Sequence, residues 1–287
     1  MKRLIKKILI ICVVLVVLLM SLNTYAHIVS KDIEITYINV SDNNIPREFN
    51  NFKIMQISDL HNKEFGKNNE KLLRIIRYYS PDIIVITGDI IDSYHPKIDI
   101  SVDFVKQAQR YAPIYYVNGN HELRIRQEYE DFKSKINGLD ITVLENEKIE
   151  INRNGQIIDL LGVNDPSVSY VDGHIDDRQN MINQLDALDC SSNNYKILLS
   201  HRPESFDIYC QRDFNLVFCG HAHGGQIILP HIGGLYSPNQ GFFPKYTSGI
   251  FTQGKTKMIV SRGLGNNAVL ARVNNNSQVV IATLKSE

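Results

Sequence analysis

Five short blocks of the sequence carry residue types that bind metal ions, and each block follows an apolar run. Asp59 and His61 lie two positions apart, as do His221 and His223, so in extended chain each pair projects to one side. Carboxylate, imidazole and amide donors without a thiolate suit Mn, Fe, Zn or Co better than calcium. The sequence therefore predicts a site for such cations, built from Asp59-Leu60-His61, Gly88-Asp89-Ile90-Ile91-Asp92, Gly119-Asn120-His121-Glu122, His201 and Gly220-His221-Ala222-His223.

Two cations side by side would suit phosphoryl transfer. Held about 3.5–4 Å apart, they clamp the attacking and the leaving oxygens and lower the pKa of a bridging water, which supplies hydroxide near neutral pH. A carboxylate must lie between them, since two dications repel. Asp89 is the candidate, because it follows the central strand between the other donors. The glycines before Asp89, Asn120 and His221 allow tight turns and close backbone approach.

The blocks lie at the ends of alternating strands and helices. In α/β sheets, sites form outside the carboxyl ends of the strands, and strand–helix alternation predicts parallel strands with helical crossovers. We predict strands at 32–40, 52–57, 83–87, 114–117, 142–144, 148–152, 156–163, 196–200, 216–219, 258–261 and 278–284. We predict helices at 68–79, 102–111, 127–136, 177–188 and 203–212, and a Gly-rich loop at 230–249.

Together the five blocks resemble the signature of the calcineurin-like metallophosphoesterases, in the same order across residues 59–223. The resemblance runs from about residue 52 to the C-terminus and implies a metallophosphoesterase-like two-sheet α/β/β/α sandwich. Two runs also resemble a membrane-associated bacterial branch that is similar to UDP-2,3-diacylglucosamine pyrophosphohydrolases. These runs are Gly220-His221-Ala222-His223-Gly224-Gly225-Gln226 and Ser261-Arg262-Gly263-Leu264-Gly265.

The resemblance assigns roles by position. It implies two divalent metal ions and hydrolysis of a phosphomonoester or phosphodiester by a metal-bridging hydroxide. His121 would act as the general acid at the leaving-group oxygen, or steady the transition state, and Asp92 would orient His121 or another ligand. One metal would be held by Asp59, His61, Asp89 and His223, and the other by Asp89, Asn120, His201 and His221.

The chain departs from the family pattern at one position. Many members carry arginine after the second aspartate of the GDxxD block, where this sequence has Ser93. Arg202, Arg262 and Arg272 are the candidates to bind phosphate in its place. His27, His95 and His174 are expected to be structural or surface residues, as is His231, for which contact with substrate stays open. Tyr236, Phe242, Phe243 and Tyr246 form an apolar wall for a lipid or nucleotide, or are ordinary packing.

The first 26 residues differ in character from the rest. Lys2, Arg3, Lys6 and Lys7 precede an apolar run from Ile8 to Met20, a pattern typical of a signal anchor or a signal peptide. We favour an uncleaved single-pass anchor in the cell membrane. Since the basic flank stays in the cytoplasm, the catalytic domain would be extracytoplasmic, or secreted after cleavage. The predicted organisation is a membrane segment at 1–26, a linker with an edge strand at 27–51 and the phosphoesterase domain at 52–287.

Charge and cysteine content limit the remaining possibilities. Lys+Arg and Asp+Glu both number 31, so no excess of positive charge indicates nucleic-acid binding. Cys190, Cys210 and Cys219 show no CxxC spacing and are expected to be free thiols, although a Cys190–Cys210 pair stays open outside the cell. We expect a monomer whose partners are a phosphate-ester substrate and the membrane.

Two alternatives to this function stay open at the level of sequence. A nuclease or a cyclic-nucleotide phosphodiesterase would use the same ligands, and the balanced charge argues mildly against it. A non-catalytic scaffold on the same fold would be expected to have lost ligands, whereas this chain has all of them. The alternatives predict different metal contents, because a scaffold would hold no stoichiometric metal.

Overall fold

The computed structural model describes residues 32–167, 176–266 and 272–287, together with isolated residues among the first 17. The predicted membrane segment therefore lies largely outside the described residues, as do His27 and His174. Within the part of the chain that is described, no helix is both long enough and apolar enough to cross a bilayer. The anchor and the location that follows from it stay predictions.

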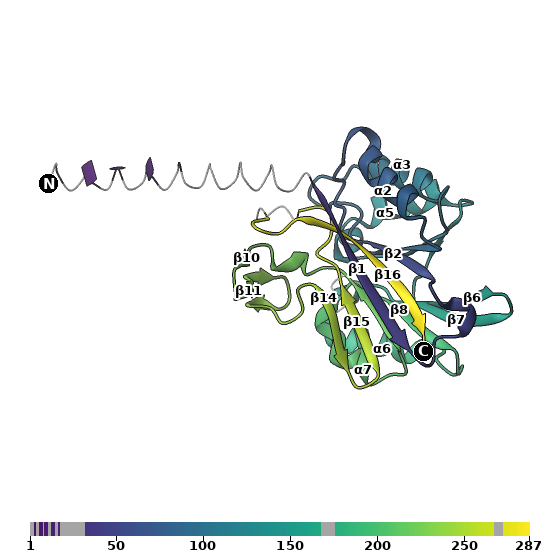
Figure 1. The fold of residues 1–287 in the computed structure, drawn as a ribbon. Helices are drawn as coiled ribbons and strands as arrows, with labels where there is room; N and C mark the ends of the chain where they lie inside the picture. The colour runs from purple at the N-terminus through teal and green to yellow at the C-terminus, as the bar shows by residue number, and fades with distance from the viewer. Residues whose placement is uncertain are drawn as a thin grey trace.

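The fold is a sandwich of two six-stranded mixed sheets with helices outside (Figure 1). In the first sheet the order is β1 (Ile33–Asp42), β16 (Ser277–Ser286), β2 (Lys53–Ile57), β3 (Ile83–Thr87), β4 (Ile114–Val117) and β5 (Ile141–Val143). In the second sheet it is β14 (Gly249–Gln253), β15 (Thr256–Val260), β9 (Leu216–Cys219), β8 (Tyr195–Leu199), β7 (Gln156–Gly162) and β6 (Glu147–Arg153).

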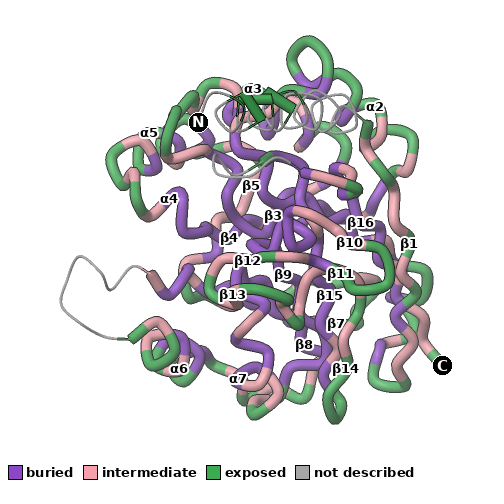
Figure 2. The backbone as a smooth tube through the Cα atoms, turned by 90° about the vertical axis from the view of Figure 1, so that its left-hand side faces the viewer, coloured by how far each residue is buried: buried purple, intermediate pink, exposed green. Residues whose placement is uncertain are grey.

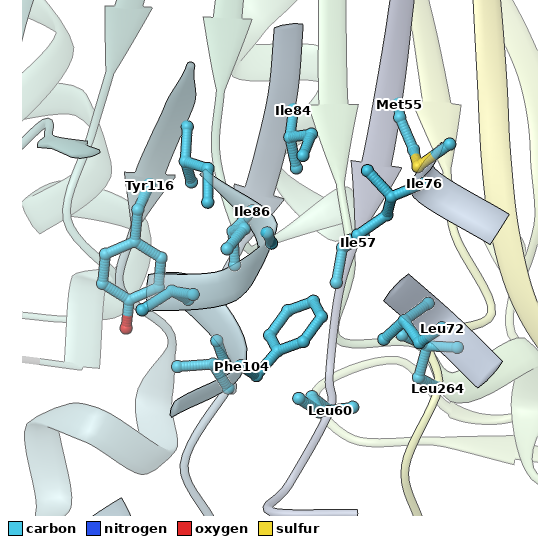
Figure 3. Packing of buried hydrophobic residues seen from close by; sticks show 14 of the residues in the cluster. Met55, Ile57, Leu60, Leu72, Ile76, Ile84, Ile86, Phe104, Tyr116 and Leu264 are labelled. Carbon is cyan, nitrogen blue, oxygen red and sulfur yellow. The ribbon is translucent and has the colours of Figure 1, made fainter. Parts of the chain in front are cut away.

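Period-two alternation explains why the sheets pack in this way. In β3, Ile84 and Ile86 face the helices, whereas Ile83 and Val85 face the second sheet. Strands buried on both faces read as continuous apolar runs, which is why these segments were recognisable in the sequence. The outer face of the first sheet is covered by α2 (Glu70–Tyr79), α3 (Ile98–Ala108) and α5 (Arg126–Ile136), and Figure 3 shows Leu72, Ile76 and Phe104 packed there against Met55 and Ile57.

A third apolar cluster lies on the other side of the second sheet. Met181 and Leu185 of α6 (Asp177–Ala187) and Phe206 and Tyr209 of α7 (Phe206–Cys210) pack on its outward side chains, such as Val217. Three apolar layers thus separate four layers of secondary structure. The predicted two-sheet α/β/β/α order is therefore the observed architecture of the described residues.

Several predicted bounds were wrong. Helix α3 begins at Ile98 rather than at 102 and ends at Ala108, and the helix expected at 203–212 is a 3-10 turn (Pro203–Ser205) followed by the short α7. Helix α4 (Asn120–Arg124) and strand β14 were not predicted. The loop expected at 230–249 contains the short pairs β10 (Ile228–Leu229) with β11 (Gly233–Gly234) and β12 (Tyr236–Ser237) with β13 (Gly241–Phe242).

Sheet topology places the ends of the central strands together. Strands β2, β3 and β4 run parallel, as do β8 and β9, so the blocks that follow them lie at one edge of the sandwich. Strand β1 is parallel to β16, which is antiparallel to β2, so the chain enters β1 at this same edge. Figure 2 looks onto the buried strands, with the exposed turns of the β10–β13 segment in front of them.

Candidate metal centre

The structure brings the predicted ligands together in two buried clusters. Donor atoms of Asp59, His61 and His223 lie within 4.8 Å of one another, and so do those of Asp89, His201 and His221. All six residues are less than 10 % exposed. Histidines packed at this distance with carboxylates, away from solvent, are an arrangement that a cation would stabilise.

Donor spacings in the first cluster fit a shared cation. Nε2 of His61 lies 3.3 Å from Nε2 of His223, and Nε2 of His223 lies 3.5 Å from Oδ1 of Asp59. A cation about 2.1 Å from each donor would hold two neighbouring donors roughly 3.0–3.4 Å apart. Two imidazole nitrogens at this distance cannot both carry a proton, since their N–H groups would face each other. At least one lone pair therefore points into the cluster.

The second cluster repeats this geometry, and Asp89 contacts both. Nδ1 of His221 lies 3.1 Å from Nε2 of His201, which lies 3.1 Å from Oδ2 of Asp89. The same Oδ2 is 3.8 Å from Nε2 of His61 in the first cluster. Asp89 therefore lies between the two groups of donors, where a bridging carboxylate would have to be.

Asn120 gives an independent indication of a missing partner. Its side chain is 5 % exposed, and Oδ1 has no hydrogen-bond partner among the described residues. Asn120 begins the short helix α4 beside Asp89, whose Oδ1 accepts a hydrogen bond of 2.8 Å from the backbone of His121. A buried amide oxygen without a donor is costly, and a cation would satisfy it. The residues present thus fit divalent metal ions.

The protonation states of several ligands also fit cations, because only a neutral imidazole ligates. Burial lowers the pKa of His61 to about 3, and it holds the pKa of His223 well below its ordinary value, with help from the charges of His61 and Arg272. Burial opposes ionisation of Asp89, yet the neighbouring His201 and His121 hold its pKa well below the usual range. Burial raises the pKa of Asp59 to about 6.

The backbone is strained where the ligands lie. Positive φ angles between 47° and 65° occur at five of the predicted ligands, although few residues other than glycine adopt them. Such strain persists only where the surroundings over-determine it, and it clusters at functional sites. The residues concerned are Asp59, His61, Asp89, His221 and His223.

Glycines make this close packing possible, as the sequence predicted. Gly88 has a φ of +88°, and a Cβ there would lie 2.6 Å from Nδ1 of His201. A Cβ on Gly119 would collide with the Asp89 carboxylate. The loops after β3 and β4 can therefore approach each other only without side chains at these two positions.

Sequence reasoning assigned no role to Glu122, which joins these two loops. Its fully buried carboxylate accepts hydrogen bonds from the backbone N–H groups of Asp89 at 2.9 Å, Ile91 at 2.9 Å and Gly119 at 2.8 Å. Glu122 lies three residues after Gly119, which follows a strand and precedes a helix. This spacing is the sequence signal that could have indicated its hydrogen bonds to the backbone. Glu122 fixes the distance between Asp89 and Asn120.

His121 lies beside the clusters with two partners rather than the one predicted. Its Nδ1 is 3.4 Å from Oδ1 of Asp92, and it accepts a hydrogen bond of 3.0 Å from the backbone N–H of Ser93. An N–H group can donate only to an unprotonated ring nitrogen, so the proton of a neutral His121 is on Nε2. Ser93, at the position where many family members have arginine, contacts this ring.

The arginines considered for phosphate binding are engaged elsewhere. Arg202 is buried and donates to Oδ1 of Asp165 at 2.8 Å, and this pairing lowers the pKa of Asp165 to about 2 against the effect of burial. Arg272 is also buried and donates to the carbonyl groups of Gly265 and Arg262. Nη1 of Arg202 lies 3.3 Å from Nε2 of His221 and Nη2 of Arg272 lies 3.2 Å from Nδ1 of His223, so both guanidinium groups also contact histidines of the centre.

A cavity of about 180 Å³ opens over the clusters. Tyr236 lines it, whereas Phe242 and Phe243 are exposed and Tyr246 packs against Phe206, so only part of the predicted apolar wall contacts this space. His231 is exposed and is not among the lining residues. The lining consists of Asp89, Tyr94, Asn120, His121, Arg124, His221, His223, Gln226, Tyr236, Pro238 and Asn239.

Comparison with known families agrees with this geometry. Residues 52–225 match the calcineurin-like phosphoesterase family, a span that includes every candidate ligand. The chain belongs to this family. As a calcineurin-like phosphoesterase it is a hydrolase that acts on phosphoester bonds, and the family implies divalent metal ions.

The cysteines expected to be free are free: Cys190, Cys210 and Cys219 form no disulfide within the described structure.

Similar proteins come from several organisms. The uncharacterized metallophosphoesterase YkuE of Bacillus subtilis is 28 % identical over 88 % of this chain and 86 % of its own length. The phosphodiesterase YaeI of Escherichia coli is 24 % identical over 75 % of this chain and 76 % of its own length. A bovine transmembrane protein with a metallophosphoesterase domain is 26 % identical over 79 % of this chain and 55 % of its own length. The solved phosphopantetheinyl hydrolase of Mycobacterium tuberculosis is 14 % identical, with a TM-score of 0.46 over 72 % of this chain and 88 % of its own.

Proposed function

We propose that this calcineurin-like phosphoesterase binds two divalent cations and hydrolyses a phosphate ester, either a monoester or a diester. Asp59, His61 and His223 would hold one cation, and Asn120, His201 and His221 the other, with Asp89 shared. The observation that carries the proposal is the position of Asp89, whose Oδ2 faces His201 at 3.1 Å and His61 at 3.8 Å. When bound, such cations polarise the phosphoryl group and supply hydroxide near neutral pH; Mn, Fe, Zn and Co suit these donors.

The residues of the chain would perform the remaining steps. Glu122 fixes the loops that carry Asp89 and Asn120, so the donors do not have to rearrange when substrate enters. His121 lines the cavity with its Nδ1 held by Ser93, which leaves the proton of Nε2 for the leaving-group oxygen. Oδ1 of Asp92 lies 3.4 Å from Nδ1 of His121, where it would accept a hydrogen bond from a protonated Nδ1. In its neutral form His121 would donate a hydrogen bond from Nε2 to the departing oxygen, and only in its doubly protonated form would it transfer that proton as general acid and be left neutral.

Two alternative functions find less support. A non-catalytic scaffold is disfavoured because every ligand position is filled and the donors converge. A nuclease or cyclic-nucleotide phosphodiesterase would act through the same centre, and the name of the YaeI relative, a phosphodiesterase, keeps a diester among the substrates to be tested. The balanced charge of the chain gives a nucleic acid no general attraction.

We further propose that the protein is anchored in the cell membrane by its first 26 residues, with the enzyme domain outside. The basic start and the apolar run at 8–20 support an anchor, and one relative is named as a transmembrane protein. Protease is added to cells whose cell wall, and outer membrane if present, has been removed but whose cell membrane is intact. We expect the enzyme domain to be cleaved and the N-terminus to be protected. Full protection of the domain in such cells would place it inside.

A substrate screen tests the activity. The Mn-loaded protein is assayed against p-nitrophenyl phosphate, bis-p-nitrophenyl phosphate, cyclic nucleotides and nucleotide-sugar lipids. We expect hydrolysis of at least one class, and loss of it after chelation with recovery on adding Mn. Protein that binds two equivalents of metal but cleaves none of these would refute the proposed range of substrates. Protein that binds no metal would refute the centre itself.

A further inference from the structure

Gln226 has an unsatisfied side chain beside the two clusters. It is 1 % exposed, and within the described part of the structure neither Oε1 nor Nε2 has a hydrogen-bond partner. Buried polar atoms are almost always paired, so an amide with both ends unpaired is an exception that needs a reason. The side chain lines the same cavity as Asp89, His121 and His221. A ligand in that cavity would meet the amide.

The backbone of Gln226 is held in a strained conformation that fixes the side chain. Its φ of 60° and ψ of −65° are close to those of the rare γ-turn with positive φ. Nδ2 of Asn275 donates to the carbonyl groups of His223 at 2.7 Å and of Gln226 at 3.0 Å, and the backbone of Val273 donates to the latter at 3.2 Å. These contacts maintain a geometry that glutamine would otherwise avoid.

The two glycines before Gln226 allow no alternative placement. A Cβ on Gly224 would lie 2.6 Å from Oδ1 of Asn275, and a Cβ on Gly225 would lie 2.5 Å from Cα of Gly234. The turn therefore packs directly against the hairpins and Asn275. The first side chain that can follow His223 is that of Gln226.

Arg124 lines the cavity as an exposed residue, whereas Ser93 and the three arginines expected to bind phosphate have other partners. Ser93 contacts His121, Arg202 is paired with Asp165, and Arg262 is paired with Glu34 at 2.7 Å. Arg272 is committed to backbone carbonyl groups. An uncharged amide within the cavity is thus well placed to donate to an oxygen of the substrate.

We propose that Gln226 is a substrate-binding residue whose Nε2 donates a hydrogen bond to a non-bridging oxygen of the phosphoryl group. This inference rests on the proposed function, because it needs a phosphate ester over the cations. This hydrogen bond would strengthen as negative charge develops on the oxygen. Both the binding of phosphate and turnover would therefore depend on Nε2 of Gln226.

Two substitutions of similar size test this role. Gln226→Met removes both polar atoms, and Gln226→Glu replaces the donor by a carboxylate that repels phosphate. Gln184→Met is the matched control, since Gln184 of α6 is also buried with both amide atoms unpaired among the described residues but does not line the cavity. The readouts are metal content, inhibition by inorganic phosphate, and kcat and KM with p-nitrophenyl phosphate.

We expect both Gln226 variants to keep wild-type metal content and to lose at least tenfold in kcat/KM and in phosphate affinity, the Glu variant more than the Met variant. The control should match wild type. Unchanged kinetics in Gln226→Met would overturn the proposal, and so would loss of metal from both variants, since the residue would then support the ligands. A wild-type protein that binds neither metal nor phosphate would overturn the proposed function as well.

A second, independent feature is an exposed apolar segment next to the cavity. Ile232, Phe242 and Phe243 are 65 %, 72 % and 63 % exposed, and all lie in residues 228–243, which we call the β10–β13 segment. Tyr236 of the same segment lines the cavity and stacks edge-on with Phe242 at 5.5 Å. Single exposed apolar residues are common, but a group of this kind marks a contact surface.

Topology places this surface on the side where the chain enters the domain. Strand β1 begins at the edge that carries the metal centre, and Glu34 near its start is paired with Arg262. The sequence that precedes β1 contains the apolar run at 8–20. A bilayer that held this run would therefore lie on the side of the cavity and its apolar rim.

We infer that the β10–β13 segment inserts its apolar side chains into a lipid bilayer, so that the cavity opens towards the membrane surface. Lys245, whose Nζ lies 4.8 Å from the centre of the Tyr246 ring, would face the head groups. A lipid-linked phosphate ester could then reach the centre without leaving the membrane.

Tryptophan fluorescence tests this contact, because the chain has no tryptophan. Full-length Phe242→Trp is reconstituted in phosphatidylethanolamine–phosphatidylglycerol vesicles with brominated acyl chains. The control is Tyr78→Trp, because Tyr78 is 78 % exposed. It lies near the end of α2, which leads into the start of β3 at the edge of the sandwich opposite the metal centre. We expect a blue shift and strong quenching for Phe242→Trp only. Absence of quenching there, or equal quenching of both, would overturn the inference.

Discussion

Nε2 of His201 lies 3.1 Å from Oδ2 of Asp89, and both side chains are buried. Nδ1 of the same ring faces the carbonyl oxygen of Thr87 at 2.7 Å. Burial alone would lower the pKa of His201, but the Asp89 carboxylate outweighs it and raises this pKa to about 10. In protein stripped of metal, a proton on His201 thus takes the place of the positive charge that a cation would bring.

This relationship predicts that metal binding releases protons. At pH 7 metal-free His201 is charged, because its pKa lies above the ordinary value, and ligation requires the neutral ring. Binding of Mn should therefore expel about one proton, and affinity should rise about tenfold per pH unit between pH 7 and 9. Below about pH 6 the raised pKa of Asp59 should steepen the dependence. Calorimetry in buffers of different ionisation enthalpy measures the protons, and a pH-independent affinity would contradict the prediction.

Asp89→Asn should abolish binding of both metals rather than of one. The substitution removes the shared negative charge while preserving size, so neither cluster retains enough charge to offset its dication. Asp159→Asn is the control, since Asp159 of β7 is equally buried but accepts a hydrogen bond from Asn194, away from the metal centre. Metal content after dialysis is the measurement. Retention of one full equivalent would show that the carboxylate belongs to a single site.

His121→Ala should keep its metals and lose activity according to the leaving group. We expect a loss of about 10²–10⁴-fold on phenyl phosphate, which needs a proton donor, and a smaller loss on p-nitrophenyl phosphate. His231→Ala, an exposed histidine outside the cavity lining, should behave as wild type. The ratio of kcat/KM for the two esters is the readout. An unchanged ratio would mean that His121 does not act on the leaving group.

Glu122→Gln should destabilise the domain. The amide group that replaces one carboxylate oxygen faces backbone N–H groups of Asp89, Ile91 or Gly119, so at least one donor loses its acceptor. We expect a loss of about 1–3 kcal/mol in urea unfolding together with weaker metal binding. Glu147→Gln on an exposed position of β6 should change neither. Wild-type stability in Glu122→Gln would show that the two loops keep their positions without the hydrogen bonds of this carboxylate.

The sequence located the candidate ligands because their signal is local. Strands such as Ile83–Thr87 are buried on both faces and read as apolar runs, and the donors follow them directly. Parallel pairing of β2, β3 and β4 then brings Asp59, Asp89 and Asn120 to one edge. The order of the blocks implied that the donor atoms converge, and the structure adds the distances between them.

Other features depend on contacts between distant segments and left no local pattern. The hairpins at 228–242 are held by backbone bonds such as that from Leu235 to Gly225 at 3.1 Å, which a Gly-rich sequence does not reveal. Strand β14 follows the loop that was predicted as one unit, and its partly exposed residues give no continuous apolar run. Gln226 ends a run that is recognisable in the sequence, but only the structure shows that its amide is buried and has no partner among the described residues.

Manganese titration of the wild-type protein, followed by electron paramagnetic resonance, tests the central claim most directly. Two cations that share Asp89 must lie close enough to couple magnetically. The account predicts two equivalents per chain and a spin-coupled signal at saturation. One equivalent, or two equivalents with the spectrum of isolated ions, would contradict it.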